Sequence, residues 1–301
     1  MNKPKRSDTS RGKNQESVPR FFLLGSGIGK SISPPIHQRA FRELGMIAEY
    51  GLLDIVETEL ERKLKETRES REIAGFNVTI PYKEKIVPFI AVLDSQASLV
   101  GAVNTVRFDN GRNMEGFNTD IDGVIASLSK LGLTGGDTGK KAVVLGAGGA
   151  ARACIYACLA NGFDEIVILN RTEARAHDLA GETSAKFPRT KLVSRELSKT
   201  QFDECVAGTC DLLINTIPQT VSLPFHTKFE TAPLSMKYFD LNYRGGGPLM
   251  KAAIDLNFEA IDGLLMLVEQ AARSFEIWTG ISAPRKMMML EAKSLVARKS
   301  K

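Results

Sequence analysis

Residues 140–152 read Lys-Lys-Ala-Val-Val-Leu-Gly-Ala-Gly-Gly-Ala-Ala-Arg. The apolar run that ends in glycine predicts a buried strand, and the apolar segment 154–160 predicts a helix after it. Asn161 and Gly162 then precede a second apolar run at 165–169. A strand, a glycine-rich turn, a helix and a second strand within about 30 residues are typical of the βαβ unit of a Rossmann-like nucleotide-binding domain.

The glycine-rich turn has the spacing of a dinucleotide-binding loop. Gly146, Gly148 and Ala151 occupy the three positions of the pattern G-x-G-x-x-(G/A). Glycine permits a tight turn and a close approach to a pyrophosphate, and the first turn of the helix offers free N–H groups and a partial positive charge. The sequence therefore predicts that a dinucleotide is bound by Gly146, Ala147, Gly148, Gly149 and Ala150.

The end of the second strand indicates which dinucleotide is bound. NAD sites usually place an acidic residue there to hold the ribose 2′-hydroxyl, whereas NADP sites need a cation for the 2′-phosphate. Here the strand ends in Asn170-Arg171-Thr172, and Arg175 follows one helical turn later. An arginine in this place can stack on the adenine or clamp the phosphate. We therefore predict NADP (NADPH) as the cofactor, with Asn170, Arg171, Thr172 and Arg175 among its ligands.

A second α/β unit precedes this one. Three apolar runs predict strands and two segments between them predict helices, at 21–25, 33–45, 50–55, 57–72 and 74–80. Such alternation favours a mainly parallel sheet that is covered by helices. Further nucleotide-domain strands are expected at 211–215 and 238–241. With a length of 301 residues, the chain is predicted to form two α/β domains.

Composition and charge exclude several classes of protein. Hydrophobic residues make up 43% of the chain, yet no apolar stretch approaches the ~18 residues of a membrane helix. The net charge of +5 comes from the two ends, because residues 1–20 carry +4 and residues 298–301 carry +3. We therefore expect neither a nucleic-acid-binding nor a membrane protein. Residues 1–20 are expected to be a disordered leader rather than a signal peptide.

The cysteines and histidines give no metal-site pattern. Cys154 and Cys158 lie four residues apart on a predicted helix, no pair has C-x-x-C spacing, and the three histidines are isolated. We expect no metal. Four free thiols favour a reducing compartment, so the cytoplasm is the expected location.

Polar side chains gather where the predicted strands of the first half end. These residues are Ser31, Ser33, Asn77, Thr79, Lys83, Asn104 and Asn118-Thr119-Asp120. In open α/β sheets ligands bind beyond the carboxyl ends of the strands, and hydroxyl and amide groups suit a polyhydroxylated ligand. Lys83 and Asp120 would form a natural proton-transfer pair.

Seven segments, in order along the chain, carry a resemblance to a known family. They are Ser31-Ile32-Ser33-Pro34, 75–84 (Gly-Phe-Asn-Val-Thr-Ile-Pro-Tyr-Lys-Glu), 101–105 (Gly-Ala-Val-Asn-Thr), Asn118-Thr119-Asp120, 146–150 (Gly-Ala-Gly-Gly-Ala), Asn170-Arg171-Thr172 and 263–270 (Gly-Leu-Leu-Met-Leu-Val-Glu-Gln). By these segments the sequence resembles the shikimate dehydrogenase family.

The resemblance implies a discontinuous substrate-binding domain and an active site in the cleft between the two domains. We accordingly expect a leader at 1–20, the first part of the substrate-binding and catalytic domain at 21–119 and a Rossmann-like NADP-binding domain at 120–262. The C-terminal helices at 263–301 are expected to return to the substrate domain.

The resemblance also implies roles for single residues. Lys83 matches the catalytic lysine of the family and Asp120 its partner. Ser31 and Ser33 match serines that bind the substrate carboxylate, and Tyr243 matches a tyrosine near that carboxylate. Thr79, Asn104 and Gln270 match residues that hydrogen-bond the ring hydroxyls. Gly263 and Met266 match the stretch along the nicotinamide.

The implied activity is that of an NADP-dependent shikimate dehydrogenase, a monomer or homodimer that reversibly reduces 3-dehydroshikimate to shikimate on the way to chorismate and the aromatic amino acids. The chain departs from the family pattern at Lys30, at 215–219 and at 245–248. These departures leave open a quinate/shikimate or aminoshikimate dehydrogenase, or a non-catalytic regulator that binds NADP and the ligand.

Overall fold

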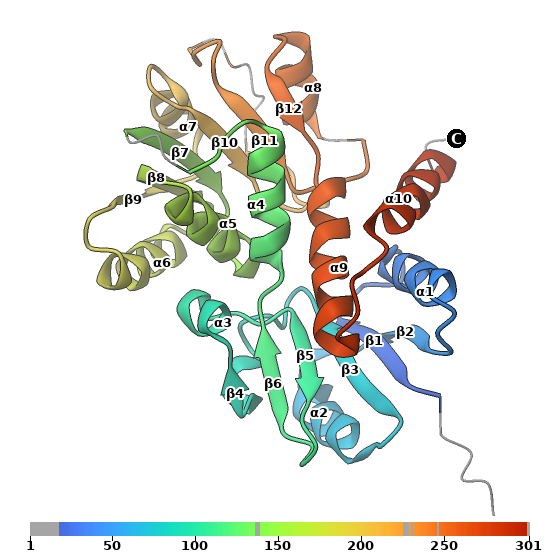
Figure 1. Ribbon diagram of the computed structural model, residues 1–301. Coiled ribbons are helices and arrows are strands. Elements are labelled where there is room, and N and C mark those ends of the chain that lie inside the picture. The colour runs from blue at the N-terminus through green and yellow to red at the C-terminus, as the bar shows by residue number, and fades with distance from the viewer. Residues whose placement is uncertain (1–17, 136–138, 225–228, 230, 246, 300–301) are drawn as a thin grey trace, which may run out of the picture.

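Two six-stranded sheets organise the chain, and each is covered by helices on both faces (Figure 1). The computed structural model describes residues 18–135, 139–224, 229, 231–245 and 247–299. Most of the predicted leader, residues 1–17, therefore lies outside the described residues. The described part begins with two residues outside any element and enters its first strand at Arg20.

The first sheet is built mainly from the first third of the chain. Its strands, in spatial order, are β2 (Glu49–Asp54), β1 (Arg20–Gly25), β3 (Ile73–Val78), β5 (Thr105–Phe108), β6 (Met114–Phe117) and β4 (Val92–Leu93). Three of the five strand pairs are parallel, whereas β5 runs antiparallel to both β3 and β6. The predicted parallel arrangement is thus correct for the βαβαβ part, and the prediction lacked the antiparallel β5–β6 hairpin.

The second sheet is entirely parallel. Its strands, in spatial order, are β12 (Glu259–Ile261), β11 (Lys237–Asp240), β10 (Leu212–Asn215), β7 (Lys140–Leu145), β8 (Phe163–Asn170) and β9 (Lys191–Glu196). The predicted strands within 140–169, 211–215 and 238–241 are confirmed, while β9 and β12 extend the sheet at its two edges. The sheet and its helices form the Rossmann-like half that the glycine-rich turn predicted.

Alternating side chains divide the core of this half into two layers. Ala142 and Val144 of β7 pack beneath α4 (Asp120–Lys130), α5 (Gly149–Ala160) and α6 (Glu173–Lys186). Val143 and Leu145 face the opposite layer, which contains α7 (Lys199–Val206) and α8 (Pro248–Asp255). Because successive side chains of a strand point to opposite faces, an uninterrupted apolar strand marks a sheet that is buried on both sides.

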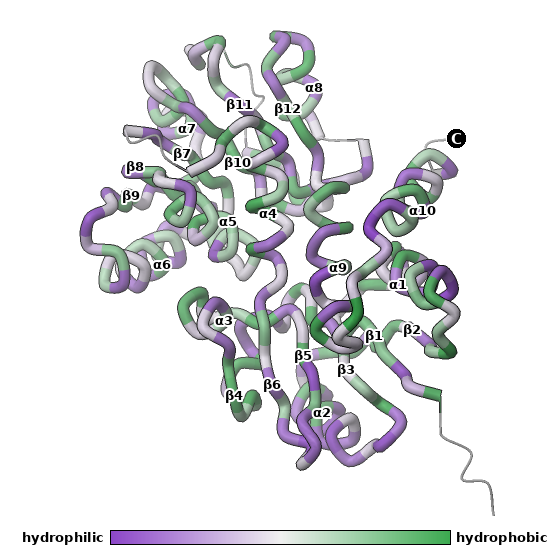
Figure 2. The backbone as a smooth tube through the Cα atoms, in the orientation of Figure 1, coloured by the Kyte–Doolittle hydropathy of each residue, from purple (hydrophilic) through white to green (hydrophobic). Residues whose placement is uncertain are grey.

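The substrate-domain sheet is covered by helices from both ends of the chain. On one face lie α1 (Ser33–Glu43), α9 (Leu264–Thr279) and α10 (Arg285–Lys299). The other face packs on Leu60 and Leu64 of α2 (Leu60–Glu69), and the rest of this helix is largely hydrophilic (Figure 2). The short helices η1 (Glu57–Glu59), η2 (Val87–Phe89) and α3 (Ser95–Val100) lie in the connections. Leu264, Leu267, Val268, Ala271 and Phe275 of α9 belong to this core.

Helices α4 and α9 run side by side between the two sheets (Figure 1). Gly123 of α4 permits this close approach, because a Cβ atom there would lie 2.5 Å from the main-chain oxygen of Met266. Residues near 120 and near 263 are consequently brought together where the two halves meet.

Candidate active site

Lys83 and Asp120 form an ion pair between the two halves. Lys83 follows the loop after β3, and Asp120 is the first residue of α4. The Nζ atom of Lys83 lies 2.5 Å from Oδ2 of Asp120, and only 14% and 5% of their side chains are exposed. The predicted proton-transfer pair is therefore present as a close contact, and most of it is shielded from solvent.

The second carboxylate oxygen of Asp120 is held by an amide. Asn104 Nδ2 donates to Asp120 Oδ1 at 2.9 Å, and the same group lies 3.5 Å from Oε1 of Gln270 on α9. The main-chain N–H of Thr119 donates to Asn104 Oδ1 at 2.8 Å, which fixes the orientation of the amide. Residues from three segments that are distant in sequence thus fix the position of the Asp120 carboxylate.

A cleft of about 390 Å³ opens at this pair. All eight predicted catalytic and substrate-binding residues line it: Ser31, Ser33, Thr79, Lys83, Asn104, Asp120, Tyr243 and Gln270. Three of the predicted cofactor residues line it as well: Ala150, Gly263 and Met266. The other predicted cofactor residues lie outside its lining, along the carboxyl edge of the second sheet.

One end of the cleft is suited to a carboxylate. Helix α1 begins at Ser33, and its next two residues, Pro34 and Pro35, carry no N–H. Ser31 Oγ lies 3.2 Å from Ser33 Oγ and accepts from the Ser33 N–H at 3.2 Å, so the two hydroxyl groups are the donors at this helix start. Asp54 holds the preceding loop by accepting from the N–H groups of Gly27 and Ile28. Hydroxyl donors and a helix N-terminus both favour an anion.

The glycine-rich turn adopts a geometry that only glycine permits. Gly146 has a φ of +108°, and a Cβ atom there would lie 2.4 Å from Oγ1 of Thr216. A Cβ atom on Gly148 would meet nothing within 4 Å, and no side chain caps the N-terminus of α5. The turn therefore leaves an open backbone cradle at a helix N-terminus, and such a cradle fits a dinucleotide pyrophosphate.

The end of β8 presents two arginines to solvent. Asn170 Nδ2 donates to the oxygen of Thr172 at 2.8 Å and shapes the turn. Arg171 and Arg175 are exposed, and within the described residues neither forms an ion pair. Two unpaired guanidinium groups, with no acid at the end of the strand, fit an extra phosphate group better than a bare ribose hydroxyl.

Sequence reasoning omitted Arg244 from the site. It lies in the loop after β11, lines the cleft and donates through Nη2 to the main-chain oxygen of Lys30 on the opposite side. Gln219 Nε2 donates to the oxygen of Arg244 at 3.3 Å, which ties the loop to the segment after β10. The signal available in the sequence was a cation directly after Tyr243.

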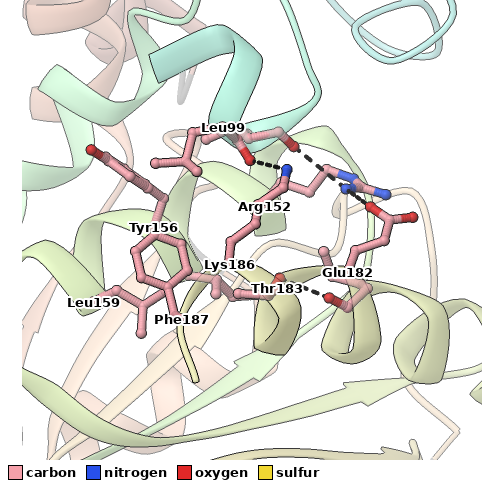
Figure 3. A pocket seen from close by; sticks show the side chains of 11 residues that line it. Leu99, Arg152, Tyr156, Leu159, Glu182, Thr183, Lys186 and Phe187 are labelled. Carbon is pink, nitrogen blue, oxygen red and sulfur yellow. Dashed lines mark hydrogen bonds and ion pairs between the residues drawn. The ribbon is translucent and has the colours of Figure 1, made fainter. Parts of the chain in front are cut away.

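Arg152 connects the two halves beside Leu99 (Figure 3). Its guanidinium lies 2.6 Å from Glu182 in its own half and 3.4 Å from Glu84, the neighbour of Lys83. Lys186 donates to the oxygen of Leu99 at 2.6 Å across the same contact. The two halves are therefore joined at Arg152, at Arg244, at the Lys83–Asp120 pair and along α4 and α9.

The cysteines lie away from this chemistry. Cys154, Cys158 and Cys210 are buried and Cys205 is half-buried, and all four are free. Burial raises the pKa of Cys210 to about 12. Among the residues that the structure describes, no group of three His, Cys, Asp or Glu side chains could hold a metal ion. No described helix is long and apolar enough to cross a membrane.

Comparison with known proteins shows the family to which the chain belongs. Residues 23–106 match the shikimate dehydrogenase substrate binding domain, residues 132–207 match the shikimate / quinate 5-dehydrogenase family, and residues 263–289 match the shikimate 5'-dehydrogenase C-terminal domain. The NADP(+) shikimate dehydrogenase of Magnetococcus marinus is 35% identical over 265 residues, which are 87% of this chain and 91% of that protein. The chain belongs to the shikimate dehydrogenase family.

Solved structures agree with this membership. The shikimate 5-dehydrogenase of Thermus thermophilus, in complex with NADP(H) and shikimate, is 30% identical with a TM-score of 0.76 and covers 92% of this chain and 100% of that one. A quinate dehydrogenase from Corynebacterium glutamicum, in complex with NAD, is 25% identical with a TM-score of 0.81 and covers 92% and 99%. The family and the two-domain α/β fold predicted from the sequence are confirmed.

Proposed function

We propose that the chain is an NADP-dependent shikimate dehydrogenase, which reversibly reduces 3-dehydroshikimate to shikimate in the pathway to chorismate and the aromatic amino acids. The observation that carries the proposal is the shielded Lys83–Asp120 contact of 2.5 Å at the meeting point of the two halves. It lies in a cleft lined by hydroxyl and amide groups, beside an open glycine-rich turn. Relatives that bear the name NADP(+) shikimate dehydrogenase support it.

The substrate is proposed to enter with its carboxylate toward the N-terminus of α1. Ser31 and Ser33 donate to the carboxylate, and Tyr243 closes this end of the cleft from the other half. Thr79, Asn104 and Gln270 then face the ring and hydrogen-bond its hydroxyl groups. This orientation places the ring ketone near Lys83.

The cofactor is proposed to lie along the carboxyl edge of the second sheet. Its pyrophosphate rests on the turn formed by Gly146, Ala147, Gly148, Gly149 and Ala150. Asn170, Arg171, Thr172 and Arg175 hold the adenosine end and the 2′-phosphate, while Gly263 and Met266 line the nicotinamide end. When bound, NADPH supplies the hydride that reduces the ketone carbon.

Lys83 supplies the proton. As the carbonyl oxygen gains negative charge, the ammonium group donates a proton to it, and a neutral amine remains paired with Asp120. Asp120 keeps Lys83 aimed into the cleft, because its other oxygen is fixed by Asn104. In the oxidation direction the neutral amine accepts the hydroxyl proton.

The division of the chain follows from this arrangement. We propose substrate-domain segments at 21–119 and 263–301 around a nucleotide-binding domain at 120–262. We also propose a cytoplasmic location, which four free cysteines favour, and a monomer or homodimer that needs neither nucleic acid nor membrane.

The proposal is tested by offering the purified chain shikimate and quinate, each with NADP⁺ and with NAD⁺, while the absorbance of the reduced nicotinamide is followed. Turnover of shikimate with NADP⁺ is expected. Turnover of quinate in its place would keep the Lys83–Asp120 pair and change the substrate. Binding of NADP⁺ and shikimate without turnover of any pair would point to a regulator.

A further inference from the structure

A buried cluster of polar side chains lies directly behind Asn104. Its members come from β2, β3, β5, the residue before α4, and α9: Tyr50, Asn77, Thr105, Thr119 and Ser274. Each is at most 6% exposed. Every buried polar group needs a partner, so a cluster of this size has to be ordered as a unit.

Ser274 lies at the centre of the cluster. Its Oγ atom lies 2.7 Å from Oγ1 of Thr105 and 3.1 Å from Oγ1 of Thr119, and it accepts from Nδ2 of Asn77 at 2.9 Å. It is also 2.9 Å from the main-chain oxygen of Gln270, one helical turn earlier. Ser274 is fully buried.

The hydroxyl group of Ser274 has one proton, which determines the direction of the hydrogen bonds around it. A main-chain oxygen can only accept, so Ser274 donates its hydroxyl proton to the oxygen of Gln270. The Oγ atom of Ser274 then accepts from Asn77 and from Thr119. Tyr50 fills the far end by donating to Asn77 Oδ1 at 2.7 Å, and burial raises the pKa of Tyr50 so that this proton is retained.

Both threonines of the cluster form hydrogen bonds with the side chain of Asn104. Thr105 Oγ1 donates to Asn104 Oδ1 at 3.0 Å, and Thr119 Oγ1 accepts from Asn104 Nδ2 at 3.0 Å. The same Nδ2 group donates to the Asp120 carboxylate at 2.9 Å. The side chain of Ser274 is therefore two hydrogen bonds away from Asn104 and three away from Asp120.

We propose that Ser274 is a positioning residue for the reaction: acting through Thr119, it fixes the Asn104 amide that holds Asp120 against Lys83. The inference rests on the proposed function of the Lys83–Asp120 pair. Ser274 touches neither substrate nor cofactor. It couples α9, which carries Gln270, to the strands that carry the rest of the substrate site.

Ser127 offers a matched control. It is also a fully buried serine within a helix, and its Oγ donates at 2.8 Å to the oxygen of Gly123, four residues earlier. No described contact joins it to Asn104 or Asp120. Ser274→Ala and Ser127→Ala therefore remove the same group from similar surroundings, and only the first removes it from the cluster.

The experiment compares kcat, KM and the pH profile of kcat for the unaltered chain and the two variants. Ser274→Ala is expected to lower kcat about tenfold, because small misplacements of reacting groups are costly, and to shift the pH profile. Its KM for NADPH should stay the same. Ser127→Ala should leave all three quantities unchanged at a similar loss of stability. Thr119→Val, which removes the hydroxyl between Ser274 and Asn104 at nearly constant shape, should reproduce the effect of Ser274→Ala and serves if that variant does not fold.

Two results would overturn the inference. An unaltered chain that turns over shikimate, with its kcat retained in both serine variants and in Thr119→Val, would show that Ser274 has only a structural role and would leave the proposed function intact. An unaltered chain without turnover would remove the proposed function, and the inference with it.

Discussion

Lys83 and Asp120 are 37 residues apart in sequence and 2.5 Å apart in space. One follows a strand of the substrate-binding half, and the other begins the helix that leads into the nucleotide-binding half. An exposed ion pair contributes little to stability, whereas a shielded pair in a cleft can hold a proton at a defined position. The pair thus joins the substrate site to the entrance of the second half.

Replacing Lys83 is expected to abolish most turnover while sparing the cofactor. Removing one positioned acid–base group costs ~10²–10⁴-fold in rate, so Lys83→Ala should lose kcat by that factor. Its dissociation constant for NADPH, measured by fluorescence titration, should stay within about twofold, because the glycine turn lies on the other half.

Lys85 provides the control for this variant. It lies two residues away and pairs with Glu57 at 2.5 Å on the exposed surface. Lys85→Ala should keep full kcat. Normal turnover in Lys83→Ala would remove the lysine from the mechanism.

Much of this site could be predicted because the decisive patterns are local. Fewer than a dozen neighbouring residues are enough to predict the glycine turn, the end of β8 or the serines at the start of α1. The reason is that a strand end and a helix start fix where their side chains point. The pairing of Lys83 with Asp120 was predicted from their chemistry and from the family resemblance, because no local pattern sets a contact between residues in different segments.

Other features could not be predicted from local patterns. Strand β5 is only four residues long and lies antiparallel between β3 and β6, while the preceding alternation of strands and helices favoured parallel pairing. Arg244 contacts Lys30 over 214 positions of sequence, so nothing in its neighbourhood marks the contact. Ser274 is one of several polar residues of α9, and only the fold places the side chains of Asn77, Thr105 and Thr119 around it.

Removal of Arg171 is expected to change the choice of cofactor. A hydrogen bond to a charged phosphate contributes ~1.5–3 kcal/mol, so Arg171→Ala should raise KM for NADPH by about 10–100-fold and leave KM for NADH nearly unchanged. Initial-rate kinetics with both cofactors measure the ratio. Arg189, an exposed arginine beyond the other end of α6, is the control, and Arg189→Ala should alter neither value. Equal losses with both cofactors would contradict a phosphate clamp.

Arg244 is expected to act on the substrate although it lies in the nucleotide-binding half. No described carboxylate pairs with its guanidinium, which reaches across the cleft to the main-chain oxygen of Lys30, next to Ser31. Arg244→Ala should raise KM for shikimate about tenfold and change KM for NADPH little. The methyl ester of shikimate, which lacks the negative charge, should bind the variant and the unaltered chain alike. Arg195→Ala, at an exposed arginine of the same half, is the control. A larger effect on the ester than on shikimate would exclude recognition of the carboxylate.

His37 is expected to make stability depend on pH. It is fully buried, stacks on Tyr50 with ring centroids 4.3 Å apart, and neither ring nitrogen has a partner among the described residues. Burial lowers the pKa of His37 to about 3. Between that value and about 6.5 the unfolded chain binds a proton that the folded chain does not, so stability is lost as the pH falls through this window.

His37→Phe keeps the stacked ring and removes the titrating nitrogens. Between pH 7 and pH 5 the unaltered chain should lose about 2 kcal/mol more unfolding free energy than this variant. Urea unfolding at the two pH values measures the difference. His177→Gln, at a histidine whose side chain is 79% exposed, should follow the unaltered chain. Parallel losses in His37→Phe and the unaltered chain would mean that His37 is protonated, or finds a partner, in the folded protein.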